Sequence, residues 1–179
     1  MGSSQSLEEK TKNGGDWKGK IFFDSGINKL SEDSYTITES ELKLQFCELR
    51  STREAIRNVR IYKSKLTSVQ LTMAILYHAY VVFETDQWWW SIEQNTEGIT
   101  VQRAKNLEAV RDKYRKGDRK WVAIKWSSLI IEDLGTGTMA DVADFLYTKN
   151  FLNKPYGWTG NNCKHFAKAF FDEVTFKFP

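Results

Sequence analysis

The sequence predicts one α+β domain in which helices pack on an antiparallel sheet. Two patterns support this: a middle section dense in aromatic and β-branched residues, and a C-terminal section with amphipathic helical spacing. The length of 179 residues fits a single domain, which we place at 21–179. Residues 1–20 are rich in Ser, Gly, Lys and Glu and lack an apolar period, so we expect a flexible tail there.

The first predicted element of the domain is helix over much of 39–60, broken near Ser51. The segment 38–41 has the spacing of a capping box, and apolar residues follow at helical intervals, namely Leu42, Phe46 and Leu49. A second candidate box at 51–54 precedes Ile56, Val59 and Arg60. These two boxes predict two consecutive helical segments.

After this segment the apolar pattern changes to that of strands. Tyr77–Thr85 and Trp88–Glu93 are rich in aromatic and β-branched residues, and Asp86-Gln87 separates them, which predicts a hairpin. Further strands are predicted at Ile99–Arg103 and Trp121–Trp126. Of the consecutive tryptophans 88–90, we expect one face in the core and the other partly exposed, where it would line a ligand or a membrane interface.

The hairpin loop fixes which side chains share a face of the sheet. If the loop has two residues, Thr85 pairs with Trp88, and His78, Glu93 and Asn95 fall on one face. A loop one residue different in length would bring Gln94 to that face instead.

The C-terminal part returns to helix. Gly135 to Thr138 is predicted to be a turn in which Thr138 caps a helix with an apolar face of Met139, Val142, Phe145 and Leu146. A loop at 154–157 follows, and Asn162 stands where an N-cap belongs. Beyond it one helical stripe opens with Cys163 and continues with Phe166, Ala167, Phe170 and Val174.

Composition excludes several classes of protein. Two cysteines and two histidines are too few for a disulfide-rich scaffold, and they leave only one His/Cys zinc site, which would need all four residues. A net charge of +3 is too small to indicate nucleic-acid binding. No apolar run of membrane-spanning length and no secretory h-region is present, so we expect a cytoplasmic protein that binds no cofactor.

The N-terminus fits a lipidation signal. Gly2 would be exposed after removal of Met1, and Ser6 stands at the required position for myristoylation. Chance and a vector-derived start are the competing interpretations. If Gly2 is acylated, basic residues in the tail would add attraction to anionic lipid and hold the protein peripherally on the cytoplasmic face of a membrane; they are Lys10, Lys12, Lys18 and Lys20.

Cys163 and His78 are the residues best placed for chemistry. A thiol in the first turn of a helix is favoured as thiolate by the unpaired amides and the helix dipole, although Cys163 also fits a small core residue. His78 lies in an apolar strand, where it is either bonded to backbone or serves as the base for Cys163. Glu93 is our candidate for the group that orients the imidazole, with Ser91 and Gln94 as alternatives.

The other histidine and cysteine are predicted to be structural. His165 lies two residues beyond Cys163, about 200° around the helix, so it does not readily reach the thiol. Cys47 lies between Phe46 and Leu49, where a buried and inert thiol is the favoured interpretation.

The order of these residues resembles the circularly permuted papain fold, in which the strand that carries the histidine precedes the helix that carries the cysteine. Asn162-Cys163-Lys164-His165-Phe166 is similar to the Asn-Cys-Glu-His-Phe block of the lecithin:retinol acyltransferase-like proteins, and also to the Asn-Cys-Asn-x-Phe block of PPPDE-type peptidases. His78-Ala79-Tyr80-Val81-Val82 looks like the histidine strand of the acyltransferase-like group. The resemblance covers roughly 75–175.

The resemblance implies a thiol hydrolase or acyltransferase that forms an acyl-enzyme on Cys163 with His78 as base. Its substrate would be a small acyl compound, with a lipid acyl group suited to a lipidated N-terminus. The acyltransferase-like proteins usually carry a second histidine on the next strand, where this chain has Trp90, Ser91 or Glu93. Two alternatives therefore stay open: a catalytically silent interaction module anchored at a membrane, and a PPPDE-type peptidase acting on a protein tag.

Overall fold

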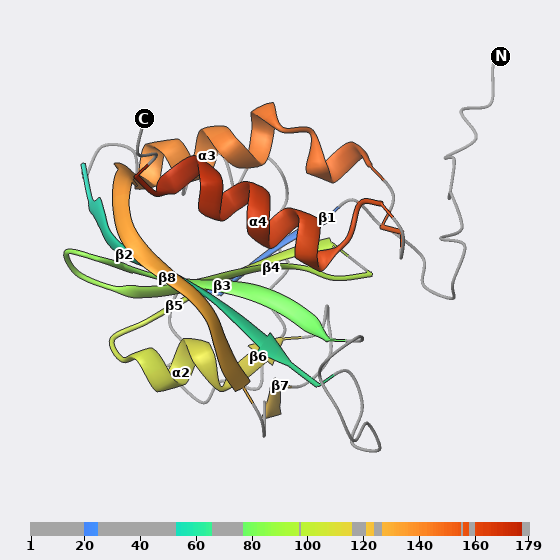
Figure 1. Ribbon diagram of the computed structural model, residues 1–179, viewed down its shortest axis with the longest axis horizontal. Helices are drawn as coiled ribbons and strands as arrows, with labels where there is room; N and C mark the ends of the chain where they lie inside the picture. The colour runs from blue at the N-terminus through green and yellow to red at the C-terminus, as the bar shows by residue number, and fades with distance from the viewer. Residues whose placement is uncertain are drawn as a thin grey trace, which may run out of the picture.

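The computed structural model describes residues 20–24, 53–65, 77–96, 98–115, 121–123, 127–154, 156–157 and 160–176. The fold is α+β, as predicted, with helices on an extensively antiparallel sheet (Figure 1). The predicted helical segment at 39–52, Cys47 and Gly2 lie outside the described residues.

Among the described residues, the main sheet has six strands in the order β1-β5-β4-β3-β2-β8. Strand β1 pairs with β5 in parallel, and every other neighbouring pair is antiparallel. The bounds are β1 (Lys20–Asp24), β2 (Ala55–Ser64), β3 (His78–Thr85), β4 (Trp89–Gln94), β5 (Gly98–Ala104) and β8 (Ser127–Thr138). Strand β1 begins at Lys20, which is the last residue of the segment predicted to be a flexible tail.

Helices cover both faces of this sheet. Helices α3 (Met139–Thr148) and α4 (Cys163–Val174) lie on one face, and the short α2 (Leu107–Arg111) lies on the other (Figure 1). We call these the α4 face and the α2 face. The α4 face is the larger core and includes Val81 and Ile92, while the α2 face includes Tyr80 and Val82.

The β3–β4 hairpin has the predicted register. Val81 pairs with Ile92 and Glu84 with Trp89, and the amide of Thr85 donates to the carbonyl of Trp88 at 2.9 Å. Because side chains alternate along a strand, Trp90 is fully buried on the α4 face and Trp89 lies on the α2 face. The ring of Trp88 is covered by the cations of Arg103 and Lys105, and that of Trp89 by Arg60.

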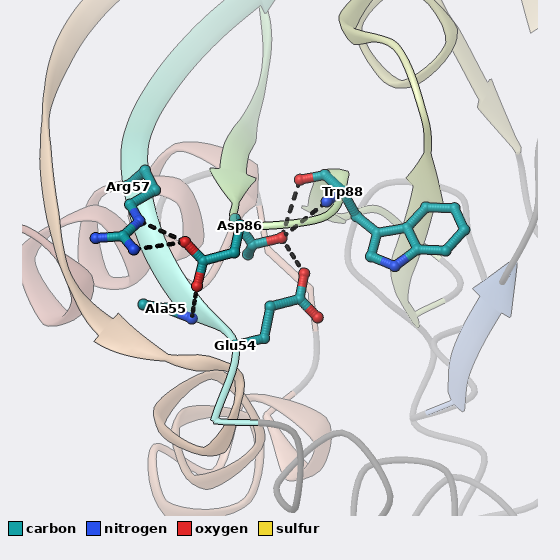
Figure 2. Close-up of polar contacts among 6 residues, drawn as sticks. Glu54, Ala55, Arg57, Asp86 and Trp88 are labelled. Atoms are coloured by element: carbon teal, nitrogen blue, oxygen red, sulfur yellow. Dashed lines mark hydrogen bonds and ion pairs between the residues drawn. The ribbon is translucent and has the colours of Figure 1, made fainter.

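Polar contacts fasten the hairpin turn to the start of β2 (Figure 2). The carboxylate of Asp86 accepts from the amide of Ala55 at 3.2 Å and from Nε of Arg57 at 2.6 Å. The buried carboxylate of Glu54 accepts from the Thr85 hydroxyl. The turn is therefore held by two carboxylates that bond to groups on a neighbouring strand.

The helix predicted to extend to residue 60 is wrong from Ala55 onward, because these residues form β2. Ile56 and Val59 are both buried, and their spacing of three imitates a helical face. In the strand, a register shift between Ile56 and Asn58 inserts one extra residue, so that both side chains reach the core. Ile61 then follows Val59 at the ordinary strand interval of two.

The turn predicted at 135–138 is also wrong, since these residues end the long strand β8. A side chain at Gly135 would place its Cβ 2.5 Å from Cγ2 of Ile56 and 2.8 Å from the Ile56 carbonyl oxygen. Glycine is therefore required for close contact with the bulged part of β2 and not for a turn. The prediction that Thr138 caps the following helix is confirmed, because Thr138 and Asp141 form a capping box.

Smaller elements complete the described part of the chain. Strands β6 (Lys113–Arg115) and β7 (Trp121–Ala123) form a separate antiparallel pair, and a 3₁₀ turn, η1 (Phe151–Asn153), follows α3. The strand predicted at 121–126 is thus confirmed as far as Ala123, and 124–126 lie outside the described residues.

Aromatic packing fixes α4 on the sheet. The predicted apolar stripe of α4 is buried, and rings from α3 and η1 pack against it: Phe145 lies edge-on to Phe166 and Phe170, and Phe151 edge-on to Phe166. Phe170 also contacts Phe83 of β3. Full burial of each such ring contributes about 1.5–3 kcal/mol, which holds the first residue of α4 at a constant place beside the sheet.

Candidate active site

The thiol of Cys163 lies in the first turn of α4, as the sequence predicted. Asn162 is the N-cap, and its side-chain oxygen accepts from the amide of Lys164 at 3.0 Å and from that of His165 at 3.3 Å. Cys163 is 4% exposed and belongs to the core of the α4 face. A cap and a buried first residue together direct the helix amides and the positive end of the dipole toward this region.

His78 and Glu93 meet across neighbouring strands, at the first residue of β3 and the last but one of β4. The paired part of the hairpin ends at Val81 and Ile92, and Glu93 reaches His78 from just beyond this last pair. Its carboxylate hydrogen-bonds Nε2 of His78, and the two side chains are 5% and 13% exposed. Since the carboxylate accepts a hydrogen bond from Nε2–H, the neutral imidazole keeps its lone pair on Nδ1, the nitrogen left for a thiol.

The thiol reaches His78 where the hairpin ladder ends. Within the described strands, paired residues of β3 and β4 run from Glu84–Trp89 to Val81–Ile92, and no pairing continues toward the start of β3. The Cys163 thiol hydrogen-bonds the His78 side chain and the backbone amide of Ala79. By strand alternation the Ala79 amide points toward β4, so the thiol takes the position that a carbonyl of β4 would occupy in a longer ladder.

The surroundings shift both groups toward an ion pair. Burial alone would raise the pKa of Cys163, but hydrogen bonding to His78, its positive charge, the Ala79 amide and Tyr156 lower this pKa from 9.0 to about 7. Burial alone would lower the pKa of His78, but the Glu93 carboxylate and the Cys163 thiolate raise it from 6.5 to about 10. Thiolate and imidazolium therefore coexist between these two values.

Tyr156 is a site residue that the sequence analysis missed. Its hydroxyl hydrogen-bonds the Cys163 side chain and the Cys163 backbone amide, and burial together with the thiolate raises its pKa far above the usual range. It lies in the loop before α4, seven residues before Cys163. The only signal in the sequence was a tyrosine between Pro155 and Gly157, in a short loop that leads to the cap.

The two alternatives to Glu93 are placed differently in the hairpin. Ser91 donates its hydroxyl to Oε1 of Gln102 at 3.1 Å on the α2 face. Gln94 is fully buried and by alternation belongs to the α4 face, opposite in direction to Glu93. The hairpin therefore brings together His78 and Glu93, and the packing of α4 adds Cys163 to this group.

His165 contacts the cap of its own helix, in keeping with the structural role predicted for it. Its Nδ1 lies 2.9 Å from the side-chain oxygen of Asn162. Within the described residues, no group of three or more His, Cys, Asp or Glu side chains is arranged to hold a metal ion. Among those residues there is also no helix with the length and apolar character needed to cross a membrane.

Comparison of the chain with family models, curated proteins and solved structures finds no significant match.

Proposed function

We propose that this protein is a cysteine-dependent hydrolase or acyltransferase that works through an acyl-enzyme on Cys163, within a circularly permuted papain-like domain. One observation carries the proposal: a buried thiol at a capped helix start hydrogen-bonds a histidine whose other nitrogen is held by a buried carboxylate. A core cysteine needs neither a histidine nor a carboxylate beside it. Perturbed pKa values in such a cluster favour nucleophilic chemistry.

The steps follow from the positions of these groups. The Cys163 thiolate attacks the carbonyl carbon of an ester, thioester or amide, and the carbonyl oxygen becomes negatively charged. The His78 imidazolium gives its Nδ1 proton to the leaving group as the bond from carbon to that group breaks, which leaves an acyl group on sulfur. Neutral His78 then takes a proton from water or another acceptor, which attacks the thioester and releases Cys163 as thiolate. Glu93 keeps the imidazole oriented and stabilises its charged form.

The substrate class is a small or lipid acyl compound in this proposal. An acylated Gly2 and a basic tail would bring the protein to the cytoplasmic face of a membrane, where acyl lipids are abundant. A PPPDE-type peptidase acting on a protein tag uses the same nucleophile and base, so only the substrate separates the two.

An acyl probe panel tests the proposal. The purified protein is treated with three thiol-reactive probes: an activated ester, a lipid β-lactone and a peptidyl vinyl sulfone. The modified residue is then located by mass spectrometry. We expect labelling at Cys163 that His78→Ala reduces at least tenfold, because the thiolate is no longer stabilised. Cys163→Ala is the matched blank.

Two outcomes of this experiment would favour one of the alternative functions. Labelling by the peptidyl probe alone would identify a peptidase. Labelling of Cys163 at the rate of a free thiol, unchanged by His78→Ala, would reject the enzyme and favour the silent interaction module.

A further inference from the structure

Two buried polar atoms on the α2 face have no hydrogen-bond partner among the described residues. They are the carboxylate oxygen Oε1 of Glu93 and the side-chain nitrogen Nε2 of Gln102. The two residues are only 4% and 1% exposed. The oxygen accepts hydrogen bonds and the nitrogen donates them, so the two atoms are complementary. Buried polar atoms are nearly always paired, which makes an unpaired acceptor and an unpaired donor on one face a feature that needs a cause.

The strand order places Glu93 between His78 and Gln102. Strand β4 lies between β3 and β5, so Glu93 has His78 on one neighbouring strand and Gln102 on the other. Gln102 pairs with Ser91 and Thr100 pairs with Glu93, which puts Gln102 diagonally beside Glu93 on the same face. Oxygen Oε2 of Glu93 bonds His78, and Oε1 is therefore the oxygen left for β5.

Ser91 sets the direction of the Gln102 amide. The Ser91 hydroxyl donates to Oε1 of Gln102 at 3.1 Å, so the accepting end of the amide is already engaged and the donating end is the one left over. No direct hydrogen bond joins this nitrogen to Glu93. Diagonal neighbours with long side chains are close enough for one water molecule to bridge them, and internal waters bind where two or more buried polar atoms lack partners.

We infer that Gln102 holds the second oxygen of Glu93 across one bound water molecule, and that this contact stabilises the Glu93 charge while His78 is neutral. The water donates to Oε1 of Glu93 and accepts from Nε2 of Gln102, so both atoms are paired. Gln102 touches neither the substrate nor the reacting atoms. It is a positioning residue that acts through Glu93.

The proposed reaction gives this contact its use. In the resting site the His78 imidazolium offsets the charge of Glu93. Once His78 has lost its Nδ1 proton, the carboxylate stays charged in the core beside a neutral ring, and a buried charge without compensation is strongly unfavourable. A second donor at Oε1 lowers the free energy of that state. This catalytic role rests on the proposed function, whereas the water site itself does not.

The first measurement is the titration of His78, which does not depend on activity. NMR follows the imidazole in a full-length Cys163→Ala background, where no thiolate affects it. We expect Gln102→Met to raise the pKa of His78 by about 0.5 to 1, because deprotonation of the ring then leaves Oε1 of Glu93 without a donor. Loosened packing would act in the opposite direction, since a weaker contact with Glu93 lowers this pKa. A fall or no change would overturn the inference.

The second measurement compares two reactions of the Cys163 thiol. Alkylation by iodoacetamide proceeds while His78 stays protonated, whereas deacylation after reaction with p-nitrophenyl acetate needs the neutral ring as base. We expect Gln102→Met to slow deacylation about three- to tenfold, because the neutral fraction of His78 falls by that factor when its pKa rises by 0.5 to 1. The alkylation rate should stay unchanged. An unchanged rate of deacylation would show that the contact has no catalytic role.

Ser91→Ala is the second variant, and Asn58→Leu is the matched control. Loss of the Ser91 hydroxyl frees the Gln102 amide to rotate, so a smaller change in the same direction is expected. Asn58 also has a buried side-chain oxygen without a partner among the described residues, but it pairs with Glu84, toward the far end of β3 from His78. Its replacement should leave the pKa of His78 unchanged, and a rise equal to that in Gln102→Met would overturn the inference.

A crystal structure of the wild-type protein tests the water directly. We expect a water molecule within hydrogen-bond distance of both Oε1 of Glu93 and Nε2 of Gln102, and its absence would overturn the inference while the proposed function stands. Alkylation of wild-type Cys163 at the rate of a free thiol would instead overturn the proposed function. The titration of His78 and the crystal structure would still decide whether the water site exists.

Discussion

Glu93 hydrogen-bonds Nε2 of His78 from the next strand, and both side chains are largely buried. This contact decides the tautomer of the imidazole and keeps its charged form stable in the core. The pair therefore links the register of one hairpin to the ionisation of a thiol on a helix far along the chain.

The first prediction concerns how the reactivity of the Cys163 thiol depends on pH. Its pKa of about 7 sets where alkylation begins, and the pKa of His78 of about 10 sets where the imidazolium is lost. Alkylation by iodoacetamide should rise with a midpoint near pH 7, and turnover of an acyl substrate should be highest between the two values and fall above pH 10. In His78→Ala, burial remains and the compensating charge is gone, so the alkylation midpoint should move above 9.

The same two groups should also affect stability, with opposite signs. The pKa of His78 is raised in the folded protein, so its contribution is complete below about pH 6.5 and is lost as pH rises through about 10. The pKa of Cys163 is lowered, so its contribution is complete above about pH 9 and is lost as pH falls through about 7. Urea unfolding of His78→Ala and wild type across this range should show the difference between them shrinking above pH 10.

The second prediction is that charge, and not only a hydrogen bond, is needed at position 93. Glu93→Gln keeps an acceptor of the same size but removes the negative charge, so the pKa of His78 should fall because its burial is no longer offset. NMR titration of the His78 imidazole follows this shift directly. Ser91→Ala is the control, since the Ser91 hydroxyl bonds to Gln102, and a shift of His78 as large as that in Glu93→Gln would contradict our assignment.

The third prediction concerns Tyr156. Its hydroxyl bonds to the Cys163 thiol and lowers the thiol pKa, so Tyr156→Phe should raise the midpoint of the alkylation profile, by less than His78→Ala does, because the hydroxyl is the weaker of the two influences. The aromatic ring stays in place in the phenylalanine variant, so the free energy of unfolding should change little. An unchanged midpoint would mean that the hydroxyl has no effect on the thiolate.

The fourth prediction is that Asn162 stabilises the protein by capping α4. Asn162→Ala removes an acceptor for two helix amides and should lower the free energy of unfolding by about 1 kcal/mol. Asn162→Ser keeps a capping oxygen and should recover most of this loss in urea titrations. Equal stability of the two variants would argue against the cap.

The fifth prediction tests the close contact of β8 with β2. Gly135→Ala would set a methyl group within 2.9 Å of the Ile56 backbone, so we expect destabilisation of about 1–3 kcal/mol. Gly160→Ala is the control, because a Cβ there has nothing within 4 Å, and its unfolding midpoint should stay near that of the wild type.

Local signals were sufficient for several parts of this protein. The α+β class, the hairpin with its register, the cap at Asn162 and the buried stripe of α4 all follow from neighbouring residues, because strand alternation and helical periodicity act over a few positions. The register alone was enough to place Glu93 near His78.

Other features depended on contacts between distant segments. Ile56 and Val59 have helical spacing, and only the bulge against β3 and β8 shows why both are buried in a strand. Strand β8 was missed because its apolar residues Leu129, Ile130 and Ile131 are consecutive and about half exposed, which gives no alternation.

The sequence by itself determined which residues have the chemistry of a nucleophile, a base and an orienting acid, because residue type and local spacing are written in the chain. Only the tertiary structure decided that they meet. The hairpin ladder ends at Val81 and Ile92, and the packing of α4 brings Cys163 to the released amide of Ala79, beside His78. Tyr156 enters the site for the same reason, since its position depends on where a loop from the C-terminal part packs against the sheet.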